Sequence, residues 1–150
     1  MNNAQRHTAF SRRTAGVFAS SALALLCKVA YPADADDARQ AAKSFNGEFD
    51  ANHMNQVYED FAGQFARSLL TKDAFVSNLA VFRANLGGGA KERSTIQEQS
   101  GTTPDGKALF SVRYRAVFPL ATVYEDLTMI KENPGGWKMY GIYFNPIPTQ

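Results

Sequence analysis

The stretch from Ala108 to Phe144 constrains the fold of this chain more than any other part. Its first segment alternates apolar residues with more polar ones, which is typical of a strand with one buried face: Phe110, Val112, Tyr114, Ala116 and Phe118. Pro119 lacks the N–H that a strand ladder needs, so it ends this strand, and a second strand is expected from Thr122 to Lys131. The residues from Asn133 to Gly136 favour a hairpin turn, and a third strand follows from Trp137 to Phe144.

The sequence before this meander has helical periodicity. The first helix is expected from Asp36 to Asn46, ended by Gly47, and the second from about Met54 to Leu69. Val57, Phe61 and Phe65 recur every four residues in the second helix. Thr71 is suited to cap a third helix, which a run of glycines ends and whose core-facing stripe is expected at Phe75, Leu79, Phe82 and Leu86.

A polar segment from Ala90 to Ser100 follows, and its composition is compatible with an edge strand or a strongly curved strand. Residues 102–107 form the turn that leads into the meander. The order of helices first and strands afterwards predicts an α+β domain, in which N-terminal helices pack on a curved four-strand antiparallel sheet.

The N-terminal segment is typical of an export signal. Three arginines, Arg6, Arg12 and Arg13, precede an apolar run from Ala15 to Leu26, and a small-x-small pattern ends at Ala35. Because Lys28 interrupts the run before about 20 apolar residues, an uncleaved membrane anchor is the less favoured alternative. The residues after the arginine pair favour the general secretory route over twin-arginine export.

Cys27 raises the alternative of a lipoprotein attachment site, since it follows an apolar run. The residue directly before such a cysteine is normally small, whereas this chain has Leu26. We therefore expect Cys27 to be removed with the leader.

Cleavage after Ala35 divides the chain into a leader, residues 1–35, and a single domain, residues 36–150, which is long enough for one hydrophobic core. Four of the 16 basic residues and one of the 14 acidic residues lie in the leader, which leaves 12 against 13 and a net charge of −1. This balance does not favour a nucleic-acid partner, and no membrane span is expected after cleavage. The predicted location is periplasmic or secreted.

Several landmarks of residues 38–144 resemble a family of exported bacterial domains known as domain-of-unknown-function family 4019. The landmarks are Phe82-Arg83, Leu86-Gly87, Arg93, Pro104-Asp105-Gly106, Glu125-Asp126-Leu127-Thr128-Met129, Gly136-Trp137-Lys138-Met139 and Gly141. The resemblance implies a cystatin-like or nuclear-transport-factor-2-like cone, with a curved sheet around helices. It implies no catalytic residue, because the family has no established activity.

Glu125 is the sharpest local feature, because it shares strand parity with Val123, Leu127 and Met129 and therefore falls on an apolar face. A buried carboxylate needs a cation or a proton. Arg83 and Arg93 are the expected partners, since both lie beside the junction of helix and sheet. This ion pair either fixes the docking of the third helix, which we favour, or contributes to ligand binding.

Aromatic residues near the mouth of the expected cone suggest a surface for a small apolar ligand, although such residues are more often core. Together with the charged residues they form the hypothetical ligand-binding set: Glu125, Arg83, Arg93, Tyr114, Trp137 and Tyr143. His53 lies between two helices without Cys, His or carboxylate at ligand spacing, so a capping or surface role is expected. No catalytic residue, metal site or cofactor is predicted.

These observations favour an exported, non-catalytic binding or interaction domain, whose partner is a small apolar molecule or another exported protein. Two alternatives remain open. One is a small enzyme in which Glu125 is a general acid or base, which would need an open pocket around it. The other is a protein that neutralises or escorts another exported protein, with homodimerisation through the sheet face as a related arrangement.

Overall fold

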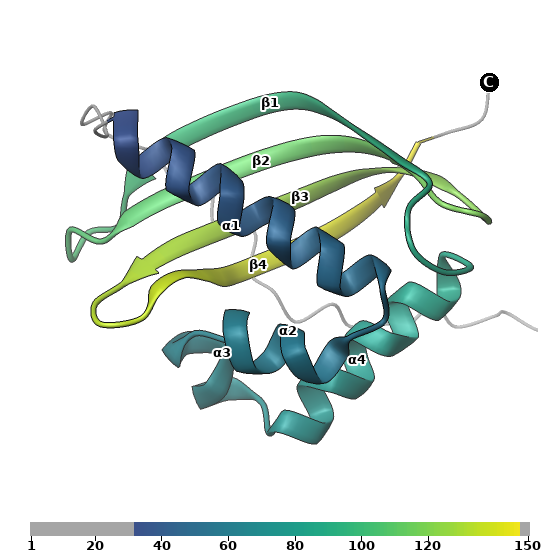
Figure 1. Cartoon of the computed structure of the whole chain (residues 1–150), viewed down its shortest axis with the longest axis horizontal. Helices are drawn as coiled ribbons and strands as arrows, with labels where there is room; N and C mark the ends of the chain where they lie inside the picture. Colours follow the sequence, from purple (N-terminus) through teal and green to yellow (C-terminus); the bar gives the residue numbers. More distant parts are fainter. Residues whose placement is uncertain (1–31, 148–150) are drawn as a thin grey trace, which may run out of the picture.

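The computed structural model describes residues 32–147, in which four helices precede a four-stranded antiparallel sheet (Figure 1). The helices are α1 (Pro32–Asp50), α2 (Met54–Phe61), α3 (Gln64–Leu69) and α4 (Lys72–Asn85). The strands are β1 (Glu92–Thr102), β2 (Ala108–Val117), β3 (Thr122–Glu132) and β4 (Gly136–Pro146), and they lie side by side in that order. The α+β class and the antiparallel meander predicted from the sequence are confirmed.

The first 31 residues of the expected leader, Cys27 among them, lie outside the described residues. The expected cleavage point after Ala35 falls within the first turns of α1, where Asp34 forms an ion pair with Lys131 of β3. No helix among residues 32–147 is both long enough and apolar enough to cross a membrane.

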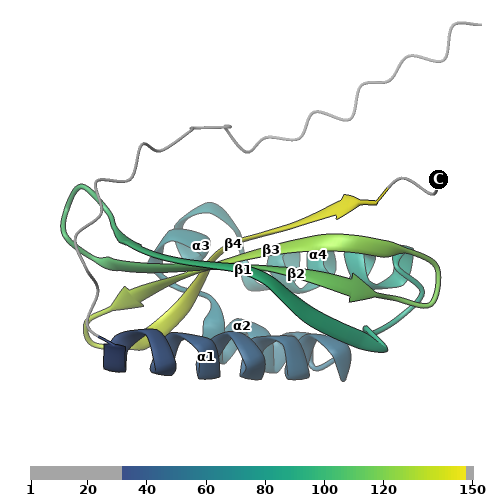
Figure 2. The same cartoon turned by 90° about the horizontal axis from the view of Figure 1, so that it is seen from above.

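Helix α1 lies along one face of the sheet (Figure 2). Ala38, Ala42, Phe45 and Phe49 recur at spacings of four, three and four residues, and all of them are fully buried. This stripe continues beyond Gly47, so the helix was predicted too short at both ends. The helix ends at Asp50, and Asn52 in the turn after it has a φ of 65°.

The second predicted helix is broken into α2 and α3 at Ala62, which forms a parallel bridge with Met139 of β4. The break restarts the helical register, so that Phe65 is half exposed and its ring stacks on Tyr140 instead of joining the core. The expectation that Phe65 continues the stripe of α2 was therefore wrong. The break coincides with this contact to the sheet and with Gly63, a residue type that commonly ends a helix.

Helix α4 begins as predicted, with the Thr71 hydroxyl accepting a hydrogen bond from the Ala74 N–H at 3.3 Å. Phe75 and Leu79 are buried, whereas Phe82 is 50% exposed. Phe82 was expected in the core but lies at its margin, where its ring is 6.0 Å from that of Phe144.

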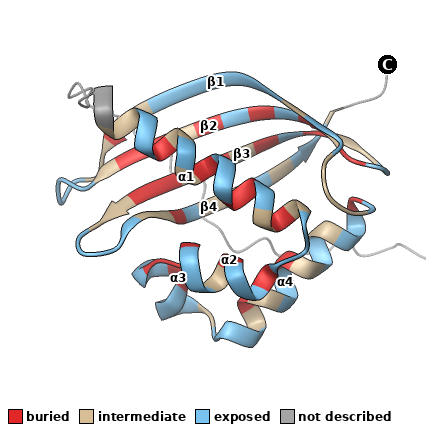
Figure 3. Ribbon diagram, in the orientation of Figure 1, coloured by how far each residue is buried: buried red, intermediate tan, exposed pale blue. Residues whose placement is uncertain are grey.

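The inner face of the sheet, which faces α1, carries the alternating residues predicted for β2 and β3. Val112 lies opposite Leu127 and Tyr114 opposite Glu125 in the β2–β3 register. Figure 3 shows that the buried positions concentrate on α1, β2 and β3. The predicted hairpin between β3 and β4 is confirmed, since Gly135 and Gly136 both have positive φ.

The two edge strands of the sheet, β4 and β1, have different contacts. The β4 edge contacts the helices through the Ala62 bridge and through Lys138, whose ammonium group donates to the Asp60 carbonyl at 2.6 Å. Strand β1 forms the other edge, as the sequence suggested, and its pairing with β2 is interrupted by a bulge between Thr95 and Gln97. The outer face of the sheet, which points away from α1, is not crossed by any of the described helices (Figures 1 and 2).

Candidate functional site

Glu125 points into the interior from the middle of β3. Its neighbours of the same parity, Val123, Leu127 and Met129, are 1% exposed or less, and Glu125 itself is fully buried. The parity argument from the sequence is therefore confirmed. A carboxylate at this position requires a partner, because burial of an unpaired charge costs on the order of several kcal/mol.

The partner is Arg93 of β1, which reaches Glu125 across the strand between them. Arg93 lies opposite Ala116 of β2, whose small, fully buried side chain leaves room for the guanidinium to cross. The Arg93 Nε donates to both carboxylate oxygens of Glu125, at 3.0 and 3.2 Å. Its terminal nitrogens bind Asp50 at the end of α1, one of them at 3.1 Å from Oδ1. One guanidinium thus holds two carboxylates.

The electrostatics of this cluster are dominated by burial. Burial raises the pKa of Glu125 above its ordinary value, and the charge and hydrogen bonds of Arg93 lower it only in part, while the charge of Asp50 adds to the rise. Burial lowers the pKa of Arg93, but hydrogen bonds to Asp50 and the charge of Glu125 outweigh this effect, so that its pKa is raised. Arg93 therefore carries a positive charge in the folded protein.

Asp50 extends the cluster into a junction between α1 and the segment that follows α4. Its Oδ1 accepts a hydrogen bond from the Ala90 N–H, and its backbone carbonyl accepts one from Arg83, both at 2.8 Å. Arg83, which was expected to bind Glu125, therefore binds the backbone of Asp50 instead. Gly89 is packed so closely that a Cβ there would lie 2.6 Å from the Asp50 carbonyl oxygen. The hydrogen bonds and ion pairs around Arg93 thus connect the end of α1 to the start of β1.

Three predicted aromatic residues lie in different places. Tyr114 is opposite Glu125 in the register and is 8% exposed; burial, with a contribution from the Glu125 charge, raises its pKa to about 12. Trp137 lies at the start of β4, and its indole N–H finds no acceptor among the described residues. Tyr143 lies opposite Asp126, on the outer face. The expected set is therefore brought together only in part.

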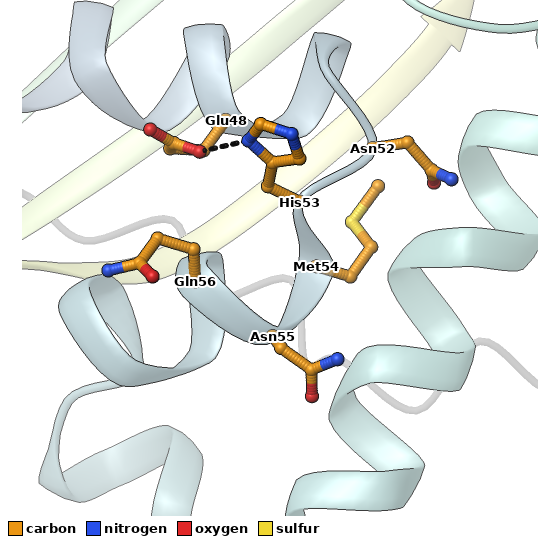
Figure 4. Close-up of a pocket in the computed structure, with 6 residues that line it drawn as sticks. All are labelled: Glu48, Asn52, His53, Met54, Asn55 and Gln56. Atoms are coloured by element: carbon orange, nitrogen blue, oxygen red, sulfur yellow. Dashed lines mark hydrogen bonds and ion pairs between the residues drawn. The ribbon is translucent and has the colours of Figure 1, made fainter.

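A hollow of about 520 Å³ lies at the corner between α1 and α2 (Figure 4). It is lined by Glu48 and by residues 52–56, and the Nδ1 of His53 lies 2.8 Å from a carboxylate oxygen of Glu48. His53 precedes α2 but forms no side-chain capping hydrogen bond. Among residues 32–147, no group of three or more His, Cys, Asp or Glu side chains is placed to hold a metal ion. The His53 corner is thus an exposed carboxylate–imidazole pair.

A second hollow, of about 190 Å³, lies on the outer face of the sheet. The side chains that line it come from three strands: Gln97, Gln99, Ser111, Arg113, Asp126 and Thr128. Arg113 and Asp126 form a two-pronged ion pair at 2.6 and 2.9 Å, and the hydroxyls of Ser111 and Thr128 are 3.0 Å apart. None of these residues was in the ligand-binding set expected from the sequence, because each is an ordinary polar residue on the solvated side of a strand.

Comparison with known proteins gives one match. The model of a family described as "Protein of unknown function (DUF4019)" matches residues 41–142, from the middle of α1 to the last strand. No curated protein and no solved structure matches the chain.

Proposed function

The chain belongs to the DUF4019 family of proteins of unknown function, and from this premise we propose that it is an exported, non-catalytic binding domain. Its binding surface is the outer face of the sheet. The observation that supports this proposal most is the state of Glu125, which is fully buried and held by Arg93. A group in this state stabilises a junction and does not meet a ligand.

The enzyme alternative requires Glu125 to exchange a proton with a substrate in an open pocket. Neither of the two hollows described above is lined by Glu125. Its raised pKa follows mainly from burial, to which the charge of Asp50 adds, so the pKa gives no independent support for catalysis. The same packing argues against a small apolar ligand between α1 and the sheet, because Phe45 and Phe49 already fill that space.

Export rests on the pattern of the N-terminal residues: Arg6, Arg12 and Arg13, then the apolar run, then Ala35 as the residue before cleavage. We infer that residues 36–150 act in the periplasm as one domain of the cystatin-like or nuclear-transport-factor-2-like type. In this form the ion pair between Asp34 and Lys131 is removed with the leader.

A photo-crosslinking amino acid tests the proposal in cells that export the full chain. One variant carries it at Thr128, in the outer-face hollow, and the control carries it at Gln40, an exposed position of α1 on the opposite side. We expect adducts from Thr128 and none from Gln40, in a periplasmic fraction in which the mature chain begins at Asp36. Adducts only from Gln40, or a chain that keeps its leader in the cytoplasm, would contradict the proposal.

A further inference from the structure

Strand β1 forms an edge of the sheet that faces solvent. Its only partner strand among the described residues is β2, so from Glu92 to Thr102 one side of its backbone pairs with no strand. Figure 2 looks onto this edge, and no described helix lies in front of it. An edge strand of this kind presents a row of N–H and C=O groups that can pair with an added strand.

The side chains of β1 offer little protection against such pairing. Natural edge strands are commonly protected by lysine, proline, short length or a bulge. Strand β1 has 11 residues without lysine or proline, and its one irregularity, between Thr95 and Gln97, leaves an unbroken run from Gln97 to Thr102. Ile96, at the irregularity, is 54% exposed. The edge is therefore long enough and open enough to receive an extended segment of another chain.

Next to this edge, on the outer face of β2, lies the exposed cation Arg115. Within the described part of the chain Arg115 forms neither a hydrogen bond nor an ion pair, whereas the other five arginines of residues 32–147 each bind a carboxylate or a backbone carbonyl. The neighbouring carboxylate of Asp126 is held by Arg113. Arg115 is therefore available to bind a carboxylate of another chain.

The two residues paired with Arg115 across the sheet differ in size. On one side is Tyr124 of β3, and the guanidinium of Arg113 lies over its ring, 5.7 Å from the centroid. On the other side is Ser94 of β1, whose side chain is small and exposed. A guanidinium that crosses Ser94 reaches the position beyond β1, where a side chain of an added strand would lie.

The inner face of the same sheet shows that an arginine can span this gap. Arg93 of β1 crosses Ala116 of β2 and binds Glu125 of β3, two strands away. Arg115, Ser94 and an added strand would repeat this arrangement on the outer face, because neighbouring strands lie about 4.8 Å apart. The added strand should therefore carry an acidic side chain opposite Ser94.

A second copy of this chain does not supply that acidic side chain. The acidic residues of β1 are Glu92 and Glu98, and Glu98 is held by Arg39 of α1. A two-fold antiparallel pairing that places Glu92 of one copy opposite Ser94 of the other would place residues 96–102 opposite residues 84–90. Those residues belong to the end of α4 and the glycine turn, so most of β1 would stay unpaired. The partner is therefore a different protein.

We propose that the β1 edge binds an extended segment of another exported protein, which adds a fifth strand to the sheet and places a carboxylate against Arg115. Addition of a strand to an exposed sheet edge is a common mode of peptide recognition. This inference rests on the proposed function, because it takes the outer face as the side on which the partner is recognised, and it adds the kind of partner.

The test uses random 12-residue peptides displayed on phage, selected against the protein purified from cells that express the full chain. We expect enriched peptides to be rich in β-branched and aromatic residues and to share one acidic position. Arg115→Glu should change that position to Lys or Arg. Arg115→Met should weaken binding of an enriched acidic peptide roughly fivefold, as expected for an exposed ion pair. Lys43→Met, which removes an exposed cation of α1, is the matched control and should bind the peptide equally.

Amide hydrogen exchange with an enriched peptide locates the contact. We expect slower exchange in β1, whose solvent-facing amides become hydrogen-bonded, and no change in α2, α3 or α4. Peptides without a shared acidic position, the same peptides selected by Arg115→Glu, or protection outside β1 would each overturn the inference. If the peptides fail while Thr128 still crosslinks to a protein in the periplasm, strand addition is refuted and the proposed function stands. If neither is observed, both are refuted.

Discussion

Replacement of Arg93 by methionine is the most direct test of how the core is held together. The substitution keeps much of the apolar stem of Arg93 but removes the cation that neutralises Glu125 and Asp50. The Asp50 side chain is 25% exposed and keeps its bond to the Ala90 N–H, so Glu125, which is fully buried, bears most of the cost. Loss of one partner of a buried ion pair typically costs about 3–5 kcal/mol in the free energy of unfolding.

The pH dependence separates this cost from a loss of packing. Burial raises the pKa of Glu125 in the folded protein, and the ordinary value of 4.5 applies to the unfolded chain. The folded state therefore binds the proton of Glu125 more tightly than the unfolded chain does. The stability that this proton contributes is complete below pH 4.5 and is lost as pH rises towards the folded pKa. Without Arg93 the folded pKa rises further. The loss of stability between pH 5 and pH 7 should therefore be larger in Arg93→Met than in the unsubstituted protein.

Urea unfolding at pH 5 and pH 7 measures both effects. Arg115→Met is the matched control, since Arg115 is exposed on the outer face of β2 and should change stability by less than about 0.5 kcal/mol. In a Glu125→Gln background, Arg93→Met should lose its pH dependence, because the titrating carboxyl is gone. A cost below about 1 kcal/mol at pH 7, or an equal cost at both pH values, would refute the assignment of Arg93 as the partner that stabilises Glu125.

Three further predictions concern the helix, the junction and the core. Gly47→Ala should raise the free energy of unfolding by up to about 1 kcal/mol, because Gly47 lies within α1 and a Cβ there meets nothing within 4 Å; a lower melting temperature would contradict this. Gly89→Ala should instead lower the free energy of unfolding by about 1–3 kcal/mol, since its Cβ would lie 2.6 Å from the carbonyl oxygen of Asp50. An unchanged urea midpoint would contradict the close packing of Gly89 against Asp50. An ultraviolet titration should show one phenol with a pKa of about 12, raised by burial, and this step should disappear in Tyr114→Phe.

The strands could be predicted closely from the sequence, because their alternation directly reflects which side chains are buried. The same alternation identified Glu125 as a buried carboxylate, and the position of Arg83 and Arg93 beside the junction of helix and sheet suggested them as its partners. The choice between the two depended on distance, which the sequence does not contain: Arg93 reaches Glu125 over the small Ala116, whereas Arg83 is taken by the carbonyl of Asp50.

The helices were predicted less well, since their ends depend on contacts with distant segments. The break at Ala62 coincides with a bridge to Met139, which is 77 residues further along the chain. Asp50 was missed altogether, because helix α1 was expected to end at Gly47, and no local pattern marks a carboxylate that caps a distant N–H.

The outer face that we propose as the binding surface differs from Glu125 in how far its residues stand out in the sequence. Glu125 stands out in the sequence because a charge interrupts an apolar face, but this same burial explains it as part of a structural junction. Gln99 and Thr128 were not in the expected ligand-binding set, because a strand exposed to solvent normally carries such residues, whereas Tyr143 was expected there as an aromatic residue. They lie on three different strands, and only the register reveals that Thr128 and Gly141 are paired and that the Tyr143 ring fills the space beside that glycine. The residues of the proposed binding surface are therefore brought together by the pairing of the strands, which the local sequence of one strand does not contain.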